Sequence, residues 1–343
     1  MDINKLLRKN IKSLKPYSSA RDEYTGKALV YLDANENPYN QPYNRYPDPL
    51  QRDVKQKIAG LKKVEPGQIF LGNGSDEPID LLIRAFCDPG EDNLIVTQPT
   101  YGMYEVAAGI NNVEVRKCPL DEIFQVNPSE LLKTADGNTK LIFLCSPNNP
   151  TGNSLNRDLV IELIENFRGL IILDEAYIDF AAEKTFLPDL KNYNNLAILQ
   201  TFSKAWGMAG IRLGMAFASQ EIISVLNKIK YPYNVNILTQ QKALELLKHP
   251  EQKEKWVKLI LTEKDALVKK LEKLPFTVKV YPSDANFVLV KIHDALGIYD
   301  YLVERAIIVR DRSKVHLCEN SLRITIGTSE ENKILIDALN ELI

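Results

Sequence analysis

The stretch that decides the fold is Leu199-Gln200-Thr201-Phe202-Ser203-Lys204-Ala205-Trp206-Gly207-Met208-Ala209-Gly210-Ile211-Arg212. A short apolar run ends in hydroxyl side chains and a lysine, and a turn containing glycine then leads to an arginine at the start of a second apolar run, 211–218. Thr201, Ser203 and Arg212 could hold a phosphate through charge-assisted hydrogen bonds. Lys204 could form a Schiff base with an aldehyde. The stretch therefore predicts a site for a ligand that carries both groups, as pyridoxal phosphate does.

Composition excludes several classes of partner. The chain has 343 residues with 43 basic and 45 acidic side chains, so its formal charge of -2 favours neither nucleic acid nor an anionic membrane. Four cysteines and three histidines are widely spaced, which argues against a zinc site and for a reducing compartment. Nowhere do 18 apolar residues run together, and residues 1–15 contain no apolar segment. We expect a cytoplasmic protein with a small-molecule partner, no metal and no membrane.

Short apolar runs alternate with helical patterns between residues 49 and 230. This alternation predicts an α/β fold whose mostly parallel sheet is covered by helices. Polar or aromatic residues follow the strand-like runs, and because the carboxyl ends of parallel strands meet at one edge, one pocket could collect them. These residues are Gly74, Ser75 and Asp76 after 69–71, Tyr101 after 93–97, Asn149 after 141–145, Asp174 and Tyr177 after 170–173, and Lys204 after 196–199.

Two of these candidates have a physical rationale of their own. The loop 72–78 has two glycines and opens a helix, where free backbone amides hold phosphate, although a plain helix cap is an alternative. Asp174 follows four apolar residues, and a buried carboxylate is costly unless a cation faces it. A protonated pyridine nitrogen is such a cation, and at about 4 Å and an effective dielectric of about 20 the pair is worth roughly 4 kcal/mol.

Together, three motifs of the chain resemble those of fold type I pyridoxal-phosphate aminotransferases, in the histidinol-phosphate branch. They are Ser203-Lys204 followed by Ala209-Gly210-Ile211-Arg212, Asn149-Pro150-Thr151-Gly152, and Leu322-Arg323-Ile324-Thr325-Ile326-Gly327-Thr328. The resemblance implies that Lys204 holds pyridoxal 5'-phosphate and later moves the substrate proton, while Asp174 makes the ring an electron sink. It also implies that Tyr101 stacks on the ring and that Asn149 and Tyr177 bind its phenolic oxygen. By the same resemblance, the cofactor phosphate is bound by Gly74, Ser75, Asp76, Thr201, Ser203 and Arg212. The substrate's acidic group is bound by Arg323 and Asn149.

The family also implies a homodimer. A segment like Arg45-Tyr46-Pro47-Asp48-Pro49 sends its tyrosine to the cofactor phosphate of the neighbouring subunit, so Tyr46 is predicted to act across the interface. Tyr17, Arg21 and Arg310 are further candidates for binding a phosphate-bearing substrate.

The pattern of proline-rich, strand-like and helical segments along the chain predicts three parts. We expect an N-terminal arm with part of a small domain at 1–45, a large cofactor-binding domain at 46–236 and a small α+β domain at 237–343. In the arm, 28–32 is strand-like. The small domain should contain helices at 237–247, 251–274 and 331–342 and strands at 277–281, 287–292, 307–309 and 322–326, with a capping box from Thr328 to Glu331.

The expected reaction is transamination of L-histidinol phosphate, with 2-oxoglutarate and glutamate as the other ketone and amine pair and imidazole acetol phosphate as the product. Aromatic amino acid transamination and threonine-phosphate decarboxylation remain alternatives, because similar motifs serve both. A regulator that binds pyridoxal phosphate without turnover would need a DNA-binding domain for which the chain has no room. A nucleotide-binding protein is opposed by Glu77, which stands where a dinucleotide fingerprint has its third glycine, and by the missing G-x-x-x-x-G-K-[ST] element.

Overall fold

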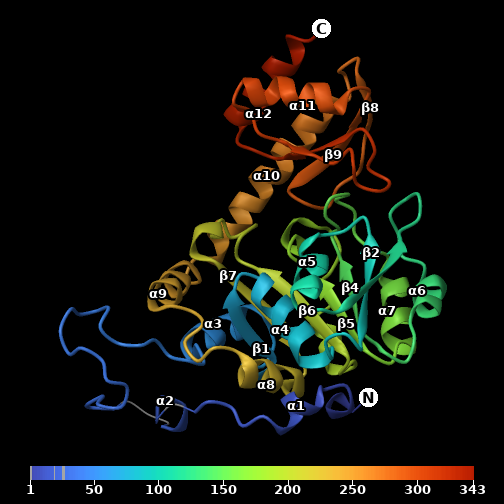
Figure 1. Ribbon diagram of the computed structural model, residues 1–343. Coiled ribbons are helices and arrows are strands. Elements are labelled where there is room, and N and C mark those ends of the chain that lie inside the picture. Colours follow the sequence, from blue (N-terminus) through green and yellow to red (C-terminus); the bar gives the residue numbers. More distant parts are fainter. Residues whose placement is uncertain (1, 19, 25–27) are drawn as a thin grey trace.

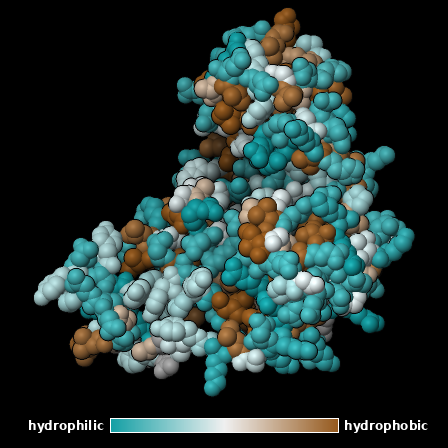
Figure 2. Space-filling view, viewed as in Figure 1, coloured by the Kyte–Doolittle hydropathy of each residue, from teal (hydrophilic) through white to brown (hydrophobic). Residues whose placement is uncertain are grey.

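The computed structural model describes residues 2–18, 20–24 and 28–343. The chain forms a large lower lobe and a smaller upper lobe, and helix α10 (Pro250–Leu271) leads from one to the other (Figure 1). Seen as a solid surface, the two lobes meet at a narrower waist (Figure 2). Within the described ranges, no helix is long and apolar enough to cross a membrane.

The large lobe is built on a seven-stranded sheet, counted over the described residues, in the order β1-β7-β6-β5-β4-β2-β3. Neighbours pair in parallel except around β7, which is antiparallel to both β1 and β6, so the predicted mostly parallel α/β sheet is confirmed. The strands are β1 (Ile69–Asn73), β2 (Asn93–Gln98), β3 (Glu114–Pro119), β4 (Thr139–Cys145), β5 (Leu170–Asp174), β6 (Leu196–Thr201) and β7 (Leu213–Ala218).

Helices cover both faces of this sheet, because alternate strand residues point to opposite sides. In β5, Ile171 and Leu173 belong to the core on one face, while Leu170 and Ile172 belong to the core on the other. The first core takes residues from α3 (Arg52–Lys62), α6 (Pro128–Thr134), α7 (Arg157–Asn166) and α9 (Ile237–Leu246). The second takes residues from α4 (Asp76–Phe86), α5 (Met103–Ile110) and α8 (Gln220–Ile229).

The antiparallel strand β7 has a consequence for the site. Its first residue, Leu213, pairs with Asn73 at the end of β1, and Gly214 lies opposite Thr201 at the end of β6. The start of β7 therefore lies at the edge where the parallel strands end. Arg212, just before β7, reaches the same edge as Lys204, just after β6. The sequence had indicated the apolar run at 211–218 but not its direction.

The small lobe packs helices on a four-stranded antiparallel sheet in the order β10-β11-β9-β8. Its strands are β8 (Thr277–Val280), β9 (Phe287–Ile292), β10 (Arg310–Asp311) and β11 (Ser321–Thr325), and its other helices are α11 (Ala295–Glu304) and α12 (Ser329–Asn340). The capping box of Thr328 and Glu331 is present at the start of α12. The strand expected at 307–309 is absent: Ile307 and Val309 pack on the core of this lobe, and ladder pairing begins only at Arg310.

The arm differs most from expectation. Residues 28–32 form no strand, because they lie away from both sheets and leave Leu29 and Leu32 exposed. In its described residues the arm forms short helices, α1 (Lys9–Ser13) and α2 (Ala20–Glu23), and a 3-10 turn at Ile3–Lys5. Its beginning packs on the large lobe, where Ile3 joins the second core and Arg8 pairs with Asp88 at 3.0 Å. Ala243, in the segment assigned to the small domain, packs in the first core of the large lobe.

Candidate active site

Most of the residues selected from the sequence line one cavity of about 130 Å³ at the carboxyl edge of the large sheet. Cys145 and Ala176 are its only lining residues, within the described part of the chain, that the sequence did not single out. The others are Gly74, Ser75, Asp76, Tyr101, Asn149, Asp174, Tyr177, Thr201, Ser203, Lys204 and Arg212. Their chemical roles remain predictions.

Lys204 supplies the amine of this cavity. Burial lowers its pKa below the ordinary value, and the positive charges of Arg323 and Arg212 lower it further. Its Nζ lies 5.4 Å from the centre of the Tyr177 ring, which forms one wall. A lysine whose pKa is lowered holds more of its amine uncharged, the form that reacts with a carbonyl and accepts a proton.

Asp174 lies at the end of β5 and is almost completely buried. Burial raises the pKa of this carboxyl to about 6, although the Tyr104 hydroxyl donates to Oδ2 at 2.7 Å and the Ala176 N–H donates to Oδ1 at 3.0 Å. Within the described chain, no cation lies within ion-pair distance of it. The neighbouring Glu175 accepts hydrogen bonds from Thr185 and the Phe186 N–H and does not line the cavity, so Asp174 is the only acid of this pair that faces it.

The cavity's polar end lies at the start of α4. Gly74 has a φ of 71°, a backbone conformation that favours glycine, and a Cβ there would come within 2.7 Å of Arg212 Nη2. The helix that this loop opens starts at Asp76, and the Ser75 side chain makes no capping hydrogen bond. Arg212 lies 3.7 Å from Asp76, whose other oxygen accepts from Tyr101 at 3.2 Å. Backbone amides, the Ser75 hydroxyl and an arginine therefore face one space.

Arg323, on β11 of the small lobe, does not line this cavity itself but contacts Asn149, which does. Its Nη1 donates to Asn149 Oδ1 at 2.5 Å, while its Nε is buried with no hydrogen-bond partner in the described structure. Because Oδ1 of Asn149 is already an acceptor, the amide's Nδ2 remains as a donor toward the cavity. Arg310 lies opposite Arg323 across the β10–β11 pair but is exposed.

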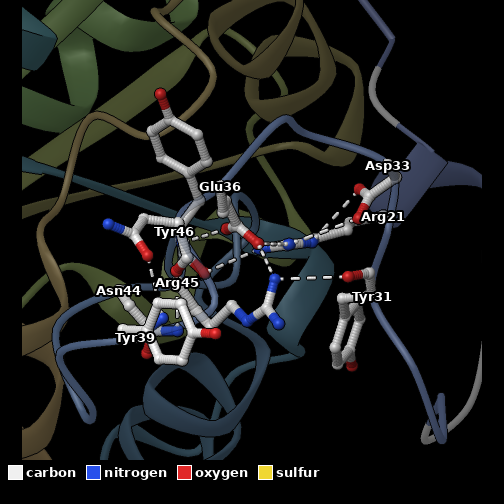
Figure 3. A network of polar contacts seen from close by, with 9 residues as sticks. Arg21, Tyr31, Asp33, Glu36, Tyr39, Asn44, Arg45 and Tyr46 are labelled. Carbon is white, nitrogen blue, oxygen red and sulfur yellow. Dashed lines mark hydrogen bonds and ion pairs between the residues drawn. The ribbon is translucent and has the colours of Figure 1, made fainter.

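The arm candidates lie elsewhere (Figure 3). Arg21 is engaged by Glu36 at 2.6 Å, by Asp33 and by the Tyr46 carbonyl, so its guanidinium is committed to the arm's own structure. The Tyr46 ring stacks on Tyr233 at 4.4 Å and does not line the Lys204 cavity of its own chain. Tyr17 is 72% exposed.

Pyridoxal phosphate fits the residues that are present. A buried carboxylate without a countercharge suits a protonated ring nitrogen, the lysine amine suits an aldehyde, and the start of α4 with Arg212 suits a phosphate. No group of three or more His, Cys, Asp or Glu side chains that could hold a metal ion occurs among the described residues.

Comparison with known proteins agrees with this geometry. The family profile of aminotransferase class I and II matches residues 27–339, which is most of the chain. The chain belongs to this aminotransferase family. It is 58% identical over 341 residues to the histidinol-phosphate aminotransferase of Parabacteroides distasonis, with 99% of each chain covered.

Solved structures of aminotransferases and a decarboxylase resemble it as well. The histidinol-phosphate aminotransferase from Clostridium acetobutylicum superposes with a TM-score of 0.80 at 27% identity, covering 88% of this chain and 91% of that one. The L-threonine-O-3-phosphate decarboxylase from Porphyromonas gingivalis gives 0.74 at 25% identity, covering 88% and 91%. The fold type I architecture is therefore shown.

Two residues of this aminotransferase were missed in the sequence. Tyr104 is fully buried, stacks on Phe143 at 4.8 Å and donates to Asp174, yet in the sequence it is one more aromatic on an apolar helix. Glu36 organises the arm; it lies within Asn35-Glu36-Asn37-Pro38, where an acid beside a proline turn is usually a surface residue. Its role depends on Arg21 and Arg45, which only the fold brings to it.

Proposed function

We propose that this aminotransferase transfers the amino group of L-histidinol phosphate to 2-oxoglutarate, giving imidazole acetol phosphate and glutamate, in histidine biosynthesis. The observation that carries the proposal is the single cavity in which Lys204, Asp174 and the start of α4 meet. The names of relatives more than half identical over the whole chain support this choice of substrate. The four cysteines, free in the described structure, support a reducing cytoplasm.

When bound, pyridoxal 5'-phosphate supplies the aldehyde that takes up the amine and a ring that withdraws the electrons left behind when the Cα proton departs. Lys204 Nζ would take up this proton and give it back, acting first as base and then as acid. Asp174 holds the ring nitrogen protonated. Asn149 Nδ2 and the Tyr177 hydroxyl orient the phenolic oxygen, and Tyr101 packs on the ring.

The remaining contacts bind the two acidic groups. The amides at the start of α4, with Ser75, Thr201, Ser203 and Arg212, take the cofactor phosphate. Arg323 takes the phosphate of histidinol phosphate or the carboxylate of glutamate, because its planar fork fits both. Both half-reactions therefore share one arginine.

We also propose a homodimer in which Tyr46 serves the neighbouring subunit's cofactor phosphate. Two observations support it. Tyr46 does not line its own chain's cavity, and the arm exposes Leu29, Val30 and Leu32, which a second copy would cover. In this assembly Tyr17 and Arg21 would lie on the arm beside the neighbour's substrate.

A half-reaction screen tests the substrate. The yellow enzyme is mixed separately with histidinol phosphate, phenylalanine, glutamate and threonine phosphate, and the loss of the cofactor's visible absorbance is followed. We expect rapid bleaching by histidinol phosphate and by glutamate. Rapid bleaching by phenylalanine alone would reassign the enzyme to aromatic amino acids.

A second candidate is threonine-phosphate decarboxylation, which the similarity to the Porphyromonas gingivalis enzyme favours. Release of carbon dioxide from threonine phosphate, without bleaching by histidinol phosphate, would select it. A colourless protein in which borohydride fixes nothing to Lys204 would overturn both candidates.

A further inference from the structure

A second cavity, of about 470 Å³, adjoins the Lys204 cavity. Tyr101 and Asn149 line both, so the two spaces share a wall. Its far side is formed by the segment between β10 and β11, which contributes Arg312, Lys314 and His316. None of these three residues belongs to the machinery described so far.

Arg312 is the half-buried member of this group, whereas Lys314 and His316 are exposed. The backbone holds Arg312 in place, because its N–H donates to the Ser321 carbonyl at 2.9 Å, next to the β10–β11 pair. The Nε of its guanidinium is buried and has no hydrogen-bond partner in the described structure. An unmet donor on a half-buried arginine is costly, so the arrangement indicates that something absent from the protein chain pairs with it.

The surrounding charges point the same way. Burial lowers the pKa of Arg312 to about 10, and the like charges of Arg323 and Arg310 lower it further. Of the nearby acids, Glu105 pairs with Lys117 at 2.8 Å, whereas Asp311 accepts from the uncharged Ser313 N–H at 2.8 Å and keeps its negative charge. Arg310, Arg312 and Arg323 therefore bring three positive charges together with too little negative charge to balance them. Because Asp311 balances one of these charges, an anion that carries more than one negative charge would balance the excess that remains.

We propose that Arg312 is a specificity-determining residue that, with Arg323 and Arg310, selects a phosphate monoester over a carboxylate. The inference rests on the proposed function and deepens it. A carboxylate has one charge and two oxygens, which the fork of Arg323 satisfies. A phosphate monoester at neutral pH carries nearly two charges and three terminal oxygens, so it has acceptors left for a second guanidinium. Arg312, lining the cavity beside Asn149, is placed to supply it.

The test compares two substrates on the same holoenzyme. Arg312→Met removes the charge and keeps the length of the side chain, while Arg312→Lys keeps the charge and removes the fork. Arg305→Met is the matched control, because Arg305 lies in the same lobe and pairs with Glu341 at the surface. Single-turnover bleaching is measured against the concentration of histidinol phosphate and, separately, of glutamate.

We expect Arg312→Met to lower the apparent affinity of the enzyme for histidinol phosphate at least tenfold, while its apparent affinity for glutamate changes less than twofold. Arg312→Lys should fall between wild type and Arg312→Met, and Arg305→Met should match wild type. Equal losses for the two substrates would show a structural role for Arg312 and would overturn the proposal. No loss in either would overturn it as well.

Inorganic phosphate provides a readout that does not depend on the identity of the amine substrate. It should inhibit the glutamate half-reaction of wild type competitively, and at least tenfold less strongly in Arg312→Met. Equal inhibition of the two enzymes would contradict the role of Arg312. If wild type were inert to histidinol phosphate but showed this difference in phosphate inhibition, the proposed substrate would fail while the anion site stood.

Discussion

At the scale of single residues, Asp174 shows how burial can set up a cofactor site before the cofactor arrives. Its carboxyl is enclosed, it accepts only two neutral hydrogen bonds, and its pKa is raised from 3.8 to about 6. Ionising it in the empty protein is therefore unfavourable. A cation placed against it removes this penalty, so binding of a protonated ring and ionisation of Asp174 favour each other.

This coupling predicts a pH effect on the stability of the cofactor-free protein. Because the folded pKa of Asp174 is above the unfolded value, the folded state binds the proton more tightly, and stability is lost as pH rises from about 4 to about 6. Two pKa units correspond to a loss on the order of 3 kcal/mol. Asp174→Asn should remove this loss, which urea unfolding at a series of pH values would measure. The same slope in both proteins would contradict the assignment.

Removing the Asp174 carboxylate should stabilise the cofactor-free protein but should harm the holoenzyme. Asp174→Asn or Asp174→Ala should retain the cofactor poorly and lose turnover by orders of magnitude, because the ring nitrogen loses its countercharge. Arg21→Ala should lose far less. Cofactor absorbance after gel filtration and the bleaching rate measure the two effects, and equal, mild losses in both variants would argue against the electron sink.

Tyr104 gives a second prediction for a single residue. Tyr104→Phe keeps the ring that stacks on Phe143 but removes the donor to Asp174, so the carboxylate loses one of its two partners. We expect a loss of about 1–3 kcal/mol in holoenzyme stability and an activity profile whose acid limb moves to higher pH. Tyr193→Phe is the control, since that hydroxyl bonds Glu165 at the surface. An unchanged pH profile in Tyr104→Phe, or the same shift in Tyr193→Phe, would contradict the role of Tyr104.

At the scale of elements, the sequence predicted the parallel strands and the residues after them, because short buried runs bounded by turn residues are local signals. It did not predict that β7 runs antiparallel, since strand direction depends on pairing between segments far apart in the chain. Strands at 28–32 and 307–309 were predicted wrongly for the same reason. Their apolar residues read as strands, but Leu29 has no neighbouring strand in the described structure, and Val309 meets the core without a ladder.

The arm is an element held by one carboxylate. Glu36 accepts from Arg21 at 2.6 Å, from Arg45 at 2.7 Å and from the Tyr46 N–H at 2.5 Å. These donors lower its pKa to about 2 despite the opposing effect of burial. The depressed pKa means that the network contributes fully above the ordinary pKa of a glutamate and is lost only as pH falls toward 2.

Glu36→Gln should therefore loosen the arm at every pH from 5 to 8. An amide can still accept a hydrogen bond, but it leaves Arg45 without its ion-pair partner Glu36 and leaves Arg21 paired with Asp33 alone. We expect faster cleavage by trypsin between residues 21 and 45 and little change in cleavage elsewhere, measured by mass spectrometry over time. Asp48→Asn, at an exposed pair with Arg52, serves as the control. Unchanged cleavage in Glu36→Gln would contradict a single organising carboxylate.

At the scale of the whole molecule, Tyr46 is the one residue assigned to the cofactor that does not line the cavity of its own chain, within the described residues. The arm extends away from the large lobe (Figure 1), and its tyrosine stacks on Tyr233 outside the cavity. If Tyr46 serves a neighbouring chain, a site needs Lys204 from one subunit and Tyr46 from the other. That requirement can be tested without a structure of the dimer.

Two weak or inactive variants should rescue each other. Lys204→Ala has no amine for the aldehyde, and Tyr46→Ala should hold the cofactor phosphate less tightly. In a mixed dimer, one site combines Lys204 of the Tyr46→Ala chain with Tyr46 of the Lys204→Ala chain, so it is intact. Dimers formed from an equal mixture, assayed at low pyridoxal phosphate, should exceed the summed activity of the parents. If Tyr46 acted within its own chain, every mixed dimer would lack a complete site, and mixing would add nothing. A monomer in light scattering would refute the shared site outright.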